Sequence, residues 1–489
     1  MRAHPHLFEI SAWPWLERLS SGAGRRLTLG DVPAAAWDAI AEQGIDIVYL
    51  MGVWKRSAIG RTLARTDLGM LREYDRALPG WSMDDVPGSP YSIQAYEPDE
   101  RMGGWTGLDT AHAAIAARGM RLMLDFVPNH LGFDHPWIES EPERFVQGTL
   151  DDYRAAPELY RPVESRDGRT LRFVACGRDP FLPPWRDVAQ LNYFNPSTRT
   201  AMTAELHAIA QHCDGVRCDM AMLVVNDVFA RTWGSRVDLL WPQPAREFWP
   251  DAIAQVPLTY LAEVYWDREY QLQQQGFHFT YDKRLLDRLR HSNPDHVRGH
   301  LHADADYSAR LARFVENHDE PRSADVLDDR VRAAAALTFT LPGLRFFFDG
   351  QFSGAALHAP VQLGRWLSES PRADVGEFYA RLLAAIDDPL FHDGEWSLRE
   401  VRSAGDGSNA QIVAAAWQLD DRRAIVAANL SSREAHGFVQ LAALPAGPML
   451  DFVDRLTGVV YRWSAADLHD GLYVRLHAGD AHVLVVQQR

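Results

Sequence analysis

The chain has 489 residues, 46% of them hydrophobic, and a formal net charge of −16 from 50 basic and 66 acidic side chains. This length suggests two or three domains, or one large barrel with additions, and the hydrophobic share is enough for a sizeable core. The acidic balance argues against nucleic acid or an anionic membrane as a partner.

The cysteine content and the absence of long apolar runs predict the compartment. Three cysteines, an odd number in a long chain, fit a reducing environment better than a disulfide framework. The first residues are not followed by an apolar run of signal-peptide length, and no stretch approaches about 18 uninterrupted apolar residues. We therefore expect a cytoplasmic protein without a membrane partner.

From Leu7 to about Asp387, short apolar runs alternate with amphipathic stretches. The runs predicted as strands are 7–10, 45–54, 121–127, 215–221, 258–264, 277–281, 313–316 and 344–348. Predicted helices include 33–43 (with Asp31 as N-cap), 110–118, 204–212, 331–340 and 375–386. This alternation predicts an α/β fold of the (β/α)8 TIM-barrel type. A doubly wound sheet is the alternative, but no Gly-rich phosphate loop follows the first strand.

Two further segments depart from the barrel rhythm. Residues 131–195 are rich in Pro, Asp and Arg and too long for an ordinary loop, which predicts an inserted subdomain after the third strand. The barrel would then comprise residues 1–130 and 196–392. Short Val-, Ala- and Leu-rich runs predict a C-terminal antiparallel β domain over 393–489, with strands at 410–418, 423–430, 437–442, 458–463 and 482–487.

The segment Gly215–Ala221 carries a charged pair inside a short apolar run. On a strand, residues two apart point to the same side, so Arg217 and Asp219 would project together, with Cys218 facing away as core filler. Buried charges are costly unless they are satisfied or used. We therefore interpret the pair as functional rather than as a structural ion pair.

A barrel's working face lies where its strands end. Beyond Arg217 and Asp219, the polar residues at predicted strand ends are Asp125, His130, Glu263, His318 and Asp319. Three of the carboxylates, Asp219, Glu263 and Asp319, would thus converge with an arginine and two histidines. Their mutual repulsion must separate their pKa values.

We expect Asp219, beside Arg217, to stay an anion and Glu263, among apolar residues, to hold a proton. An anionic nucleophile and a protonated acid, roughly 5–5.5 Å apart, are what glycosidic cleavage with retention requires. No metal site is predicted, because His130 and His318 lie in different loops without ligand spacing.

These segments resemble the short blocks of the α-amylase family of retaining glycoside hydrolases and transglycosidases. The blocks are Asp125-Phe-Val-Pro-Asn-His130, Gly215-Val-Arg-Cys-Asp219, Leu261-Ala-Glu-Val264, Val315-Glu-Asn-His-Asp319 and, near the end of the insertion, Val188-Ala-Gln-Leu-Asn192. Their order and spacing match over the whole barrel, and the ordered set is far more specific than any single block.

The resemblance implies roles for seven residues. Asp219 would be the nucleophile that forms a glycosyl-enzyme intermediate, Glu263 the general acid and then base, and Asp319 the residue that holds the sugar hydroxyls. Four residues would bind the substrate. Arg217 would orient Asp219, and His130 and His318 would bind the sugar hydroxyls. Tyr91 would lie beneath the sugar ring. For Tyr91 the alternative is a packed loop tyrosine, whereas Asp125 is expected to order the site from behind.

The family pattern also breaks at one place. Many amylases continue the fourth-strand block into a Lys-His pair that touches the leaving-group side and helps a calcium site, and here those positions are Met222 and Leu223. We therefore expect no required cofactor, and the departure argues against a structural calcium ion. Asn129 matches a calcium ligand of some relatives, with a loop-capping asparagine as the favoured alternative.

The sequence thus predicts a retaining α-glycosidase acting on α-glucosides or malto-oligosaccharides, with hydrolysis of α-1,4 linkages as the first choice. The alternative is an α-transglycosidase or disaccharide isomerase, because a sugar can intercept the same intermediate. A catalytically inactive binding protein is a third class, opposed by the intact trio of carboxylates. Trp185 and Trp266 are further candidates for sugar contacts, and no oligomeric state is predicted.

Overall fold

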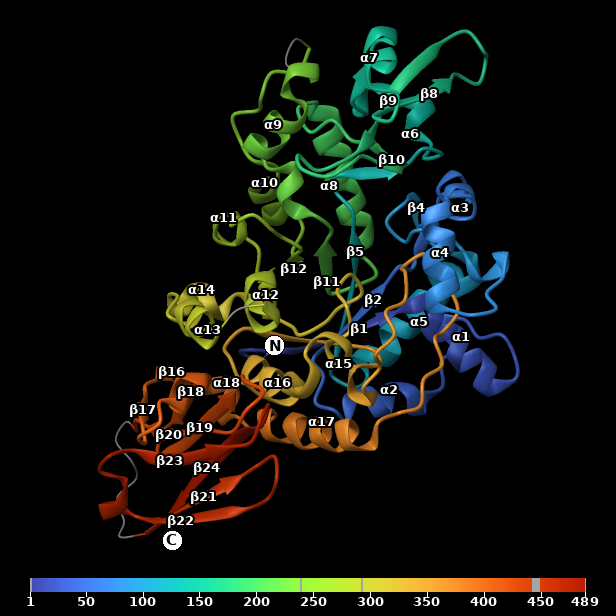
Figure 1. Ribbon diagram of the computed structural model, residues 1–489. Helices are drawn as coiled ribbons and strands as arrows, with labels where there is room; N and C mark the ends of the chain where they lie inside the picture. The colour runs from blue at the N-terminus through green and yellow to red at the C-terminus, as the bar shows by residue number, and fades with distance from the viewer. Residues whose placement is uncertain (1, 238–239, 292, 442–448, 489) are drawn as a thin grey trace.

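The computed structural model describes residues 2–237, 240–291, 293–441 and 449–488, and eight parallel strands close a barrel at its centre (Figure 1). Each strand pairs with the next in the chain and the last pairs with the first. The strands are β1 (His6–Ser11), β2 (Ile47–Met51), β5 (Arg121–Phe126), β11 (Gly215–Cys218), β12 (Thr259–Ala262), β13 (Phe279–Tyr281), β14 (Leu311–Arg313) and β15 (Leu344–Phe348). The predicted (β/α)8 barrel is confirmed.

Helices surround the barrel and connect its strands (Figure 1). In the first part they are α1 (Ala12–Ala23), α2 (Ala34–Ala41), α3 (Ala58–Ala64), α4 (Leu68–Ala77) and α5 (Gly104–Ala116), with a small hairpin of β3 (Trp54–Arg56) and β4 (Ile93–Pro98). After the insertion they are α8 (Pro196–Ile209), α9 (Asn226–Val237), α10 (Phe248–Gln255), α11 (Glu269–Gln274), α12 (Lys283–His291), α13 (Pro294–Leu301), α14 (Ala305–Ala309), α15 (Ser323–Val326), α16 (Val331–Phe339), α17 (Ala373–Ile386) and α18 (Leu390–Asp393).

Several predicted boundaries were wrong for local reasons. The predicted strand 45–54 divides into β2 and β3, because the positive φ of Gly52 breaks the run. The predicted strand 313–316 is displaced to β14, since the chain beyond Arg313 leaves the ladder and Glu316 turns to accept hydrogen bonds from Ser323. Asp31 is not the cap of α2; it closes a capping box with Thr28 one turn earlier.

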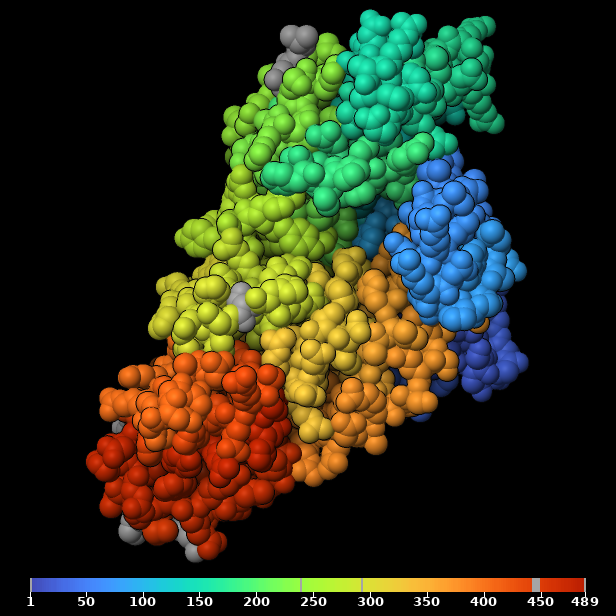
Figure 2. Space-filling view, in the orientation of Figure 1, coloured from blue at the N-terminus to red at the C-terminus, as the bar shows by residue number. Residues whose placement is uncertain are grey.

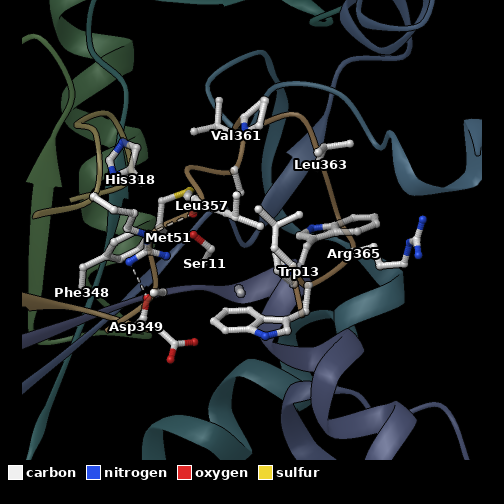
Figure 3. Close-up of a pocket in the computed structure, with 18 of the residues that line it drawn as sticks. Ser11, Trp13, Met51, His318, Phe348, Asp349, Leu357, Val361, Leu363 and Arg365 are labelled. Carbon is white, nitrogen blue, oxygen red and sulfur yellow. Dashed lines mark hydrogen bonds between the residues drawn. The ribbon is translucent and has the colours of Figure 1, made fainter. Parts of the chain in front are cut away.

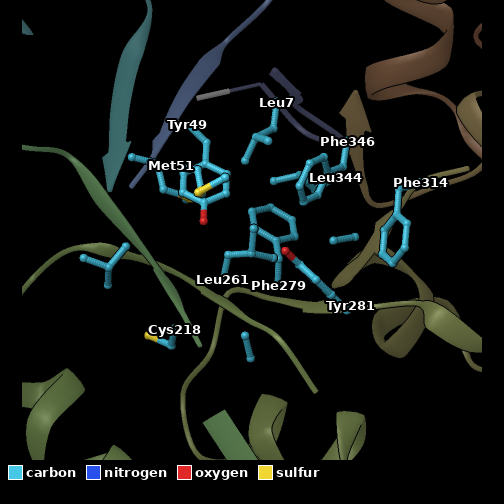
Figure 4. Close-up of a cluster of buried hydrophobic side chains, with 14 of the residues drawn as sticks. Leu7, Tyr49, Met51, Cys218, Leu261, Phe279, Tyr281, Phe314, Leu344 and Phe346 are labelled. Atoms are coloured by element: carbon cyan, nitrogen blue, oxygen red, sulfur yellow. The ribbon is translucent and has the colours of Figure 1, made fainter. Parts of the chain in front are cut away.

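The barrel interior is filled by aromatic and aliphatic side chains from successive strands (Figure 4). Tyr49, Leu261, Tyr281 and Phe346 all have 0% exposure. Cys218 also lies buried within this core, and all three cysteines are free. Its predicted place as core filler, facing away from Arg217 and Asp219, agrees with its position in the cluster.

The insertion after β5 forms its own small sheet, which lies at one end of the molecule (Figure 1). Its elements are β6 (His130–Gly132), α6 (Trp137–Ser140), β7 (Gln147–Gly148), α7 (Leu150–Ala155), β8 (Tyr160–Glu164), β9 (Leu171–Gly177) and β10 (Trp185–Gln190). The strand order is β6-β10-β9-β7, with β8 also on β9. The predicted divisions at 130/131 and 195/196 stay predictions; β6 begins one residue before the first division, and the other strands lie between the two.

The C-terminal strands form antiparallel sheets, as predicted. They are β16 (Glu395–Arg399), β17 (Val401–Ser403), β18 (Ile412–Leu419), β19 (Arg422–Asn429), β20 (Ala435–Val439), β21 (Met449–Asp454), β22 (Val460–Ser464), β23 (Leu472–Leu476) and β24 (Ala481–Gln488). Four of these, β16, β17, β21 and β23, were not predicted, and the end of the predicted strand 437–442 lies outside the described residues.

The β domain is attached to the barrel through a buried contact. Trp417 on β18 has 0% exposure, and its indole nitrogen donates to the Thr340 carbonyl just after α16 (2.7 Å). No helix in the described part of the chain has the length and apolar character that crossing a membrane would require.

Candidate active site

Arg217 and Asp219 project together from the end of β11, as the strand pattern predicted. The Arg217 guanidinium donates to Asp219 from one terminal nitrogen (Nη1 to Oδ1, 2.8 Å). Arg217 is completely buried and Asp219 is 6% exposed. Backbone hydrogen bonds from β11 to both neighbouring strands hold the pair, with Asp219 N donating to Phe126 O (2.9 Å).

The same guanidinium reaches the two other predicted carboxylates. Its second terminal nitrogen lies 2.9 Å from Glu263 and 3.6 Å from Asp319. Glu263 follows β12 and is 4% exposed, whereas the Asp319 side chain is 39% exposed toward solvent. One arginine therefore gathers all three predicted catalytic carboxylates at the carboxyl ends of the strands.

The two histidines and the tyrosine lie around this cluster. His130 Nε2 is 4.0 Å from Asp219, and its ring packs against Trp185 (centroids 5.3 Å apart). His318 Nε2 lies 2.9 Å from Asp319 and 2.6 Å from the Tyr91 hydroxyl. The Tyr91 and His318 rings stack at 5.5 Å, so Tyr91 is part of the site rather than a loop residue packed elsewhere.

The structure adds residues that the sequence analysis missed. Glu9 on β1 is fully buried and accepts hydrogen bonds from the His318 ring and backbone. The Tyr265 hydroxyl and the Met220 backbone N–H both donate to Glu263 (2.8 and 2.7 Å). Glu9 had a signal in the sequence, a carboxylate within an apolar strand, whereas Tyr265 and Met220 had none.

Asp125 lies behind the site, where the sequence analysis expected it. Its buried carboxylate accepts hydrogen bonds from the Tyr49 hydroxyl and from the Gly52 backbone (2.7 Å). Burial raises the pKa of Asp125, although the Arg217 charge opposes the shift. Asp125 thus contributes to the same field while making no direct contact with Asp219.

The expectation that Asp219 stays an anion in the free protein was wrong. Burial, followed by the charge of Glu263, raises the pKa of Asp219 to about 8, although Arg217 lowers it. The physical reason is the shared guanidinium, since Arg217 divides its positive charge among three carboxylates instead of pairing with Asp219 alone. Two close carboxyl groups titrate as a pair, so this pair keeps a proton at neutral pH.

The two histidines carry different charges. Burial lowers the pKa of His130 to about 3, so its ring is neutral at neutral pH. Burial also disfavours charge on His318, but Asp319 and Glu9 raise its pKa well above the ordinary value. The pKa of Asp319, which burial would raise, is lowered to about 2 by the charge and hydrogen bond of His318. The result is a charged Asp319–His318–Glu9 chain beside the Asp219–Glu263 pair.

Asn129, Met222 and Leu223 are the residues on which the expectation about calcium depends, and all three are buried. The Asn129 side-chain oxygen accepts a hydrogen bond from Gln190 Nε2 (2.9 Å), which fixes the amide within the protein. Met222 and Leu223 are buried apolar residues at 0% and 3% exposure. Among the described residues no group of three or more His, Cys, Asp or Glu is arranged to hold a metal ion.

The molecular surface carries a hollow beside the inserted subdomain. Figure 2 shows this hollow between the inserted subdomain and the blue segment that holds α3 and α4. Asp319 is more exposed than Asp219 and Glu263. Solvent therefore reaches at least this member of the cluster.

Comparisons with known proteins agree with this architecture. No protein-family model matches the sequence. The chain is 25% identical to "Alpha-amylase MalA" of Haloarcula japonica over 360 residues (72% of this chain, 47% of that protein). It is 23% identical to "Alpha-amylase 3" of Dictyoglomus thermophilum over 257 residues (48% of each). The chain thus spans about half the length of the curated relatives it matches.

Solved structures share the fold over the full chain. A maltogenic α-amylase, AmyB, from Thermotoga neapolitana superimposes with a TM-score of 0.70 at 17% identity, covering 100% of this chain and 99% of that one. An α-amylase from Geobacillus thermoleovorans, crystallised with acarbose, gives 0.68 at 17% identity and the same coverage. These structures and this chain have in common a closed (β/α)8 barrel, and here a cluster of carboxylates lies at the ends of its strands. In sequence the chain is similar to α-amylases, and it shares the (β/α)8-barrel fold of the solved ones.

Proposed function

We propose that this protein is a retaining α-glycosidase that hydrolyses α-linked gluco-oligosaccharides, with α-1,4 linkages as the first choice. The observation that carries the proposal is the position of Asp219 and Glu263 on the two terminal nitrogens of one buried guanidinium, at 2.8 and 2.9 Å. Two carboxyl groups so placed can act on a single glycosidic bond, and they hold a proton between them at neutral pH. The α-amylases among the relatives support the substrate class.

The first step needs the shared proton on Glu263 and the negative charge on Asp219. Glu263 gives its proton to the leaving glycosidic oxygen as the bond from this oxygen to the sugar's anomeric carbon breaks. An Asp219 oxygen forms a new bond to that carbon, which produces a glycosyl ester. In the second step Glu263 takes a proton from water, the water oxygen bonds to the anomeric carbon, and Asp219 leaves as a carboxylate.

The residues around the pair hold the sugar. Asp319, which His318 keeps ionised, is suited to accept hydrogen bonds from ring hydroxyls, and these bonds would strengthen as positive charge develops on the sugar. The Tyr91 ring offers a flat face beside Arg217 (5.3 Å from the guanidinium carbon to the ring centroid), and sugars present apolar faces to such rings. Neutral His130 can bind a hydroxyl without adding charge.

Substitution of the nucleophile tests the proposal. Wild type should release reducing sugar from maltotriose, whereas Asp219→Asn should lose at least about 1000-fold in kcat/KM. The first product, followed by NMR, should carry the α configuration. Equal activity in both proteins, or a β first product, would refute the mechanism.

The same assay separates the alternatives. A sugar acceptor in place of water would give longer oligosaccharides or a rearranged disaccharide, with the same dependence on Asp219. Trehalose, tested beside maltotriose, extends the panel to another linkage. Binding of malto-oligosaccharides without turnover would instead indicate an inactive binding protein.

A further inference from the structure

A long segment without helix or strand crosses one side of the mouth. Residues 354–372, here called the strap, connect the 3-10 turn Gln351–Ser353 after β15 to helix α17 and pass beside α4 (Figure 1, orange). The strap is longer than ordinary connections in compact domains, and such loops are commonly functional. Its contacts show that it is held firmly at two places.

At the end near the site, the strap lies against His318. The His358 ring makes a hydrogen bond to the His318 carbonyl (Nε2 to O, 3.0 Å), and Arg322 donates to the Leu357 carbonyl (3.4 Å). The positive field of His358 also helps to lower the pKa of Asp319. Leu357 is 42% exposed, an apolar side chain held beside charged residues of the site.

Around its middle, at residues 363–367, the strap is fixed to a different part of the chain. Arg365 forms an ion pair with Asp85 (3.0 Å) and donates to the Gly80 carbonyl (3.0 Å). The Trp366 backbone N–H donates to Glu17 (3.1 Å). Leu363 and Leu367 are buried with residues of α3 and α4 in a separate apolar cluster. The strap therefore bridges β15 to the segment around residue 85.

Little space remains beneath the strap. Figure 3 shows Leu357, Val361 and Leu363 of the strap above Trp13, with His318 at the side of the cavity. The volume of this cavity is about 40 Å³. One water molecule needs about 10–15 Å³, so this cavity has the size of a few water molecules, and the strap packs closely over Trp13.

The barrel order tells which end of a substrate meets the strap. Glu263 follows β12, so the leaving group, whose oxygen Glu263 would protonate, lies on that side. In the closed ring of eight strands, β1 lies opposite β12, and β15 and β2 flank β1. The strap spans this opposite sector, where the sugar chain on the non-reducing side of the cleaved bond would have to continue.

We infer that the strap closes the non-reducing side of the site immediately beyond the sugar being cleaved, so that the enzyme removes single glucosyl units from chain ends. The inference rests on the proposed glycosidase function and names its substrate class: α-glucans or oligosaccharides with a free non-reducing end. A strap with a purely structural role would leave room for sugars on both sides of the cleaved bond, and internal linkages would then be hydrolysed.

An end-blocked substrate tests the inference. Two p-nitrophenyl maltoheptaosides are compared with the wild-type protein, one with a free non-reducing end and one with a cyclic acetal across O4 and O6 of its terminal glucose. The free substrate should yield glucose as the first product, and the blocked one should react at least about 100-fold more slowly. Similar rates on both, or maltose as the first product, would overturn the inference while leaving the glycosidase function intact. Turnover of neither substrate would refute the proposed function itself.

A variant at the middle anchor tests whether the strap is responsible. Arg365→Ala removes the contacts to Asp85 and Gly80 without touching the carboxylate cluster. It should raise the ratio of blocked to free substrate turnover about tenfold, because a weaker anchor increases the open population. Arg332→Ala on α16 is the matched control, since it removes an exposed ion pair with Asp374 (3.0 Å) of α17. An unchanged ratio in Arg365→Ala, or an equal rise in the control, would contradict a role for the strap.

Discussion

The substitution Glu9→Gln examines the buried ion pair that the sequence analysis missed. Glu9 and His318 are both buried, at 0% and 2% exposure, and the Glu9 carboxylate accepts from the His318 ring and backbone. Burial alone would lower the pKa of His318, yet the charges of Asp319 and Glu9 raise it well above the ordinary value. Glutamine keeps the volume and an acceptor for the backbone N–H, so the change removes mainly the charge.

The expected cost follows from the geometry. Removing one partner of a buried ion pair typically costs about 3–5 kcal/mol in the free energy of unfolding. We expect about 3 kcal/mol, the lower end, because Asp319 still lies 2.9 Å from the other ring nitrogen of His318. The raised pKa of His318 sets the pH dependence. Its stabilisation is complete below the unfolded pKa of about 6.5 and is lost as the pH rises through the folded pKa. The difference between wild type and variant should therefore be largest near about pH 6 and smaller near about pH 9.

Urea unfolding followed by tryptophan fluorescence at both pH values measures this difference. Glu395→Gln on β16 is the matched control, since Glu395 is an exposed glutamate far along the chain in the C-terminal sheet. It should change the free energy of unfolding by less than about 0.5 kcal/mol. A Glu9→Gln effect below about 1 kcal/mol, or one equal at both pH values, would show that the pair does not hold the charge on His318 as argued.

Four other outcomes are expected. Arg217→Lys should lower kcat/KM about 100-fold or more, because one ammonium group cannot replace the two terminal nitrogens that contact Asp219 and Glu263. A loss of kcat/KM below about threefold would contradict this reasoning. Since the pKa of Asp219 is raised to about 8, the Asp219–Glu263 pair should lose its remaining proton above this pH, and kcat/KM should fall there. A pH profile of kcat/KM that stays flat to about pH 10 would refute the shared proton. Tyr265→Phe removes a hydrogen bond to Glu263 (2.8 Å) and should lower kcat about tenfold, with the KM for maltotriose little changed. An unchanged kcat would show that this hydrogen bond is dispensable. Trp417→Ala should lower the free energy of unfolding by about 3–5 kcal/mol in a denaturant titration, because Trp417 is fully buried where the β domain contacts the barrel. The folded protein should keep its kcat, and a change below about 1 kcal/mol would count against that contact.

The barrel and the carboxylate cluster could be predicted because their signals are local. A charged residue in a short apolar run is costly to bury, so Arg217 and Asp219 stood out on β11. The same reasoning, applied to Leu7-Phe8-Glu9-Ile10, would have selected Glu9 on β1. The strand ends then place such residues at one mouth, whichever helices connect them.

Other features depend on contacts between distant residues. His358 meets His318, and Arg365 meets Asp85, across 40 and 280 positions, and no periodic pattern encodes either contact. The orientation of the Arg217 guanidinium is also a tertiary feature. The sequence suggested that this charge serves Asp219 alone, whereas the structure divides it among three carboxylates.

This division explains how the site can keep an acid protonated at neutral pH. The carboxyl groups of the cluster outnumber its cations, because Arg217 and the charged His318 lie among four buried carboxyl groups (Glu9, Asp125, Asp219 and Glu263) and the more exposed Asp319. A buried excess of negative charge favours retention of a proton. Burial and the neighbouring Glu263 raise the pKa of Asp219, so the proton is retained at the Asp219–Glu263 pair. The chain from Glu9 through His318 to Asp319 keeps Asp319 ionised, so the proton is not lost to the residue that would hold the sugar. Arg217 lies at the Asp219–Glu263 pair, where a proton would be transferred, and the charged His318 lies at Asp319, which would bind the sugar hydroxyls. The two functions are thus separated within one cluster.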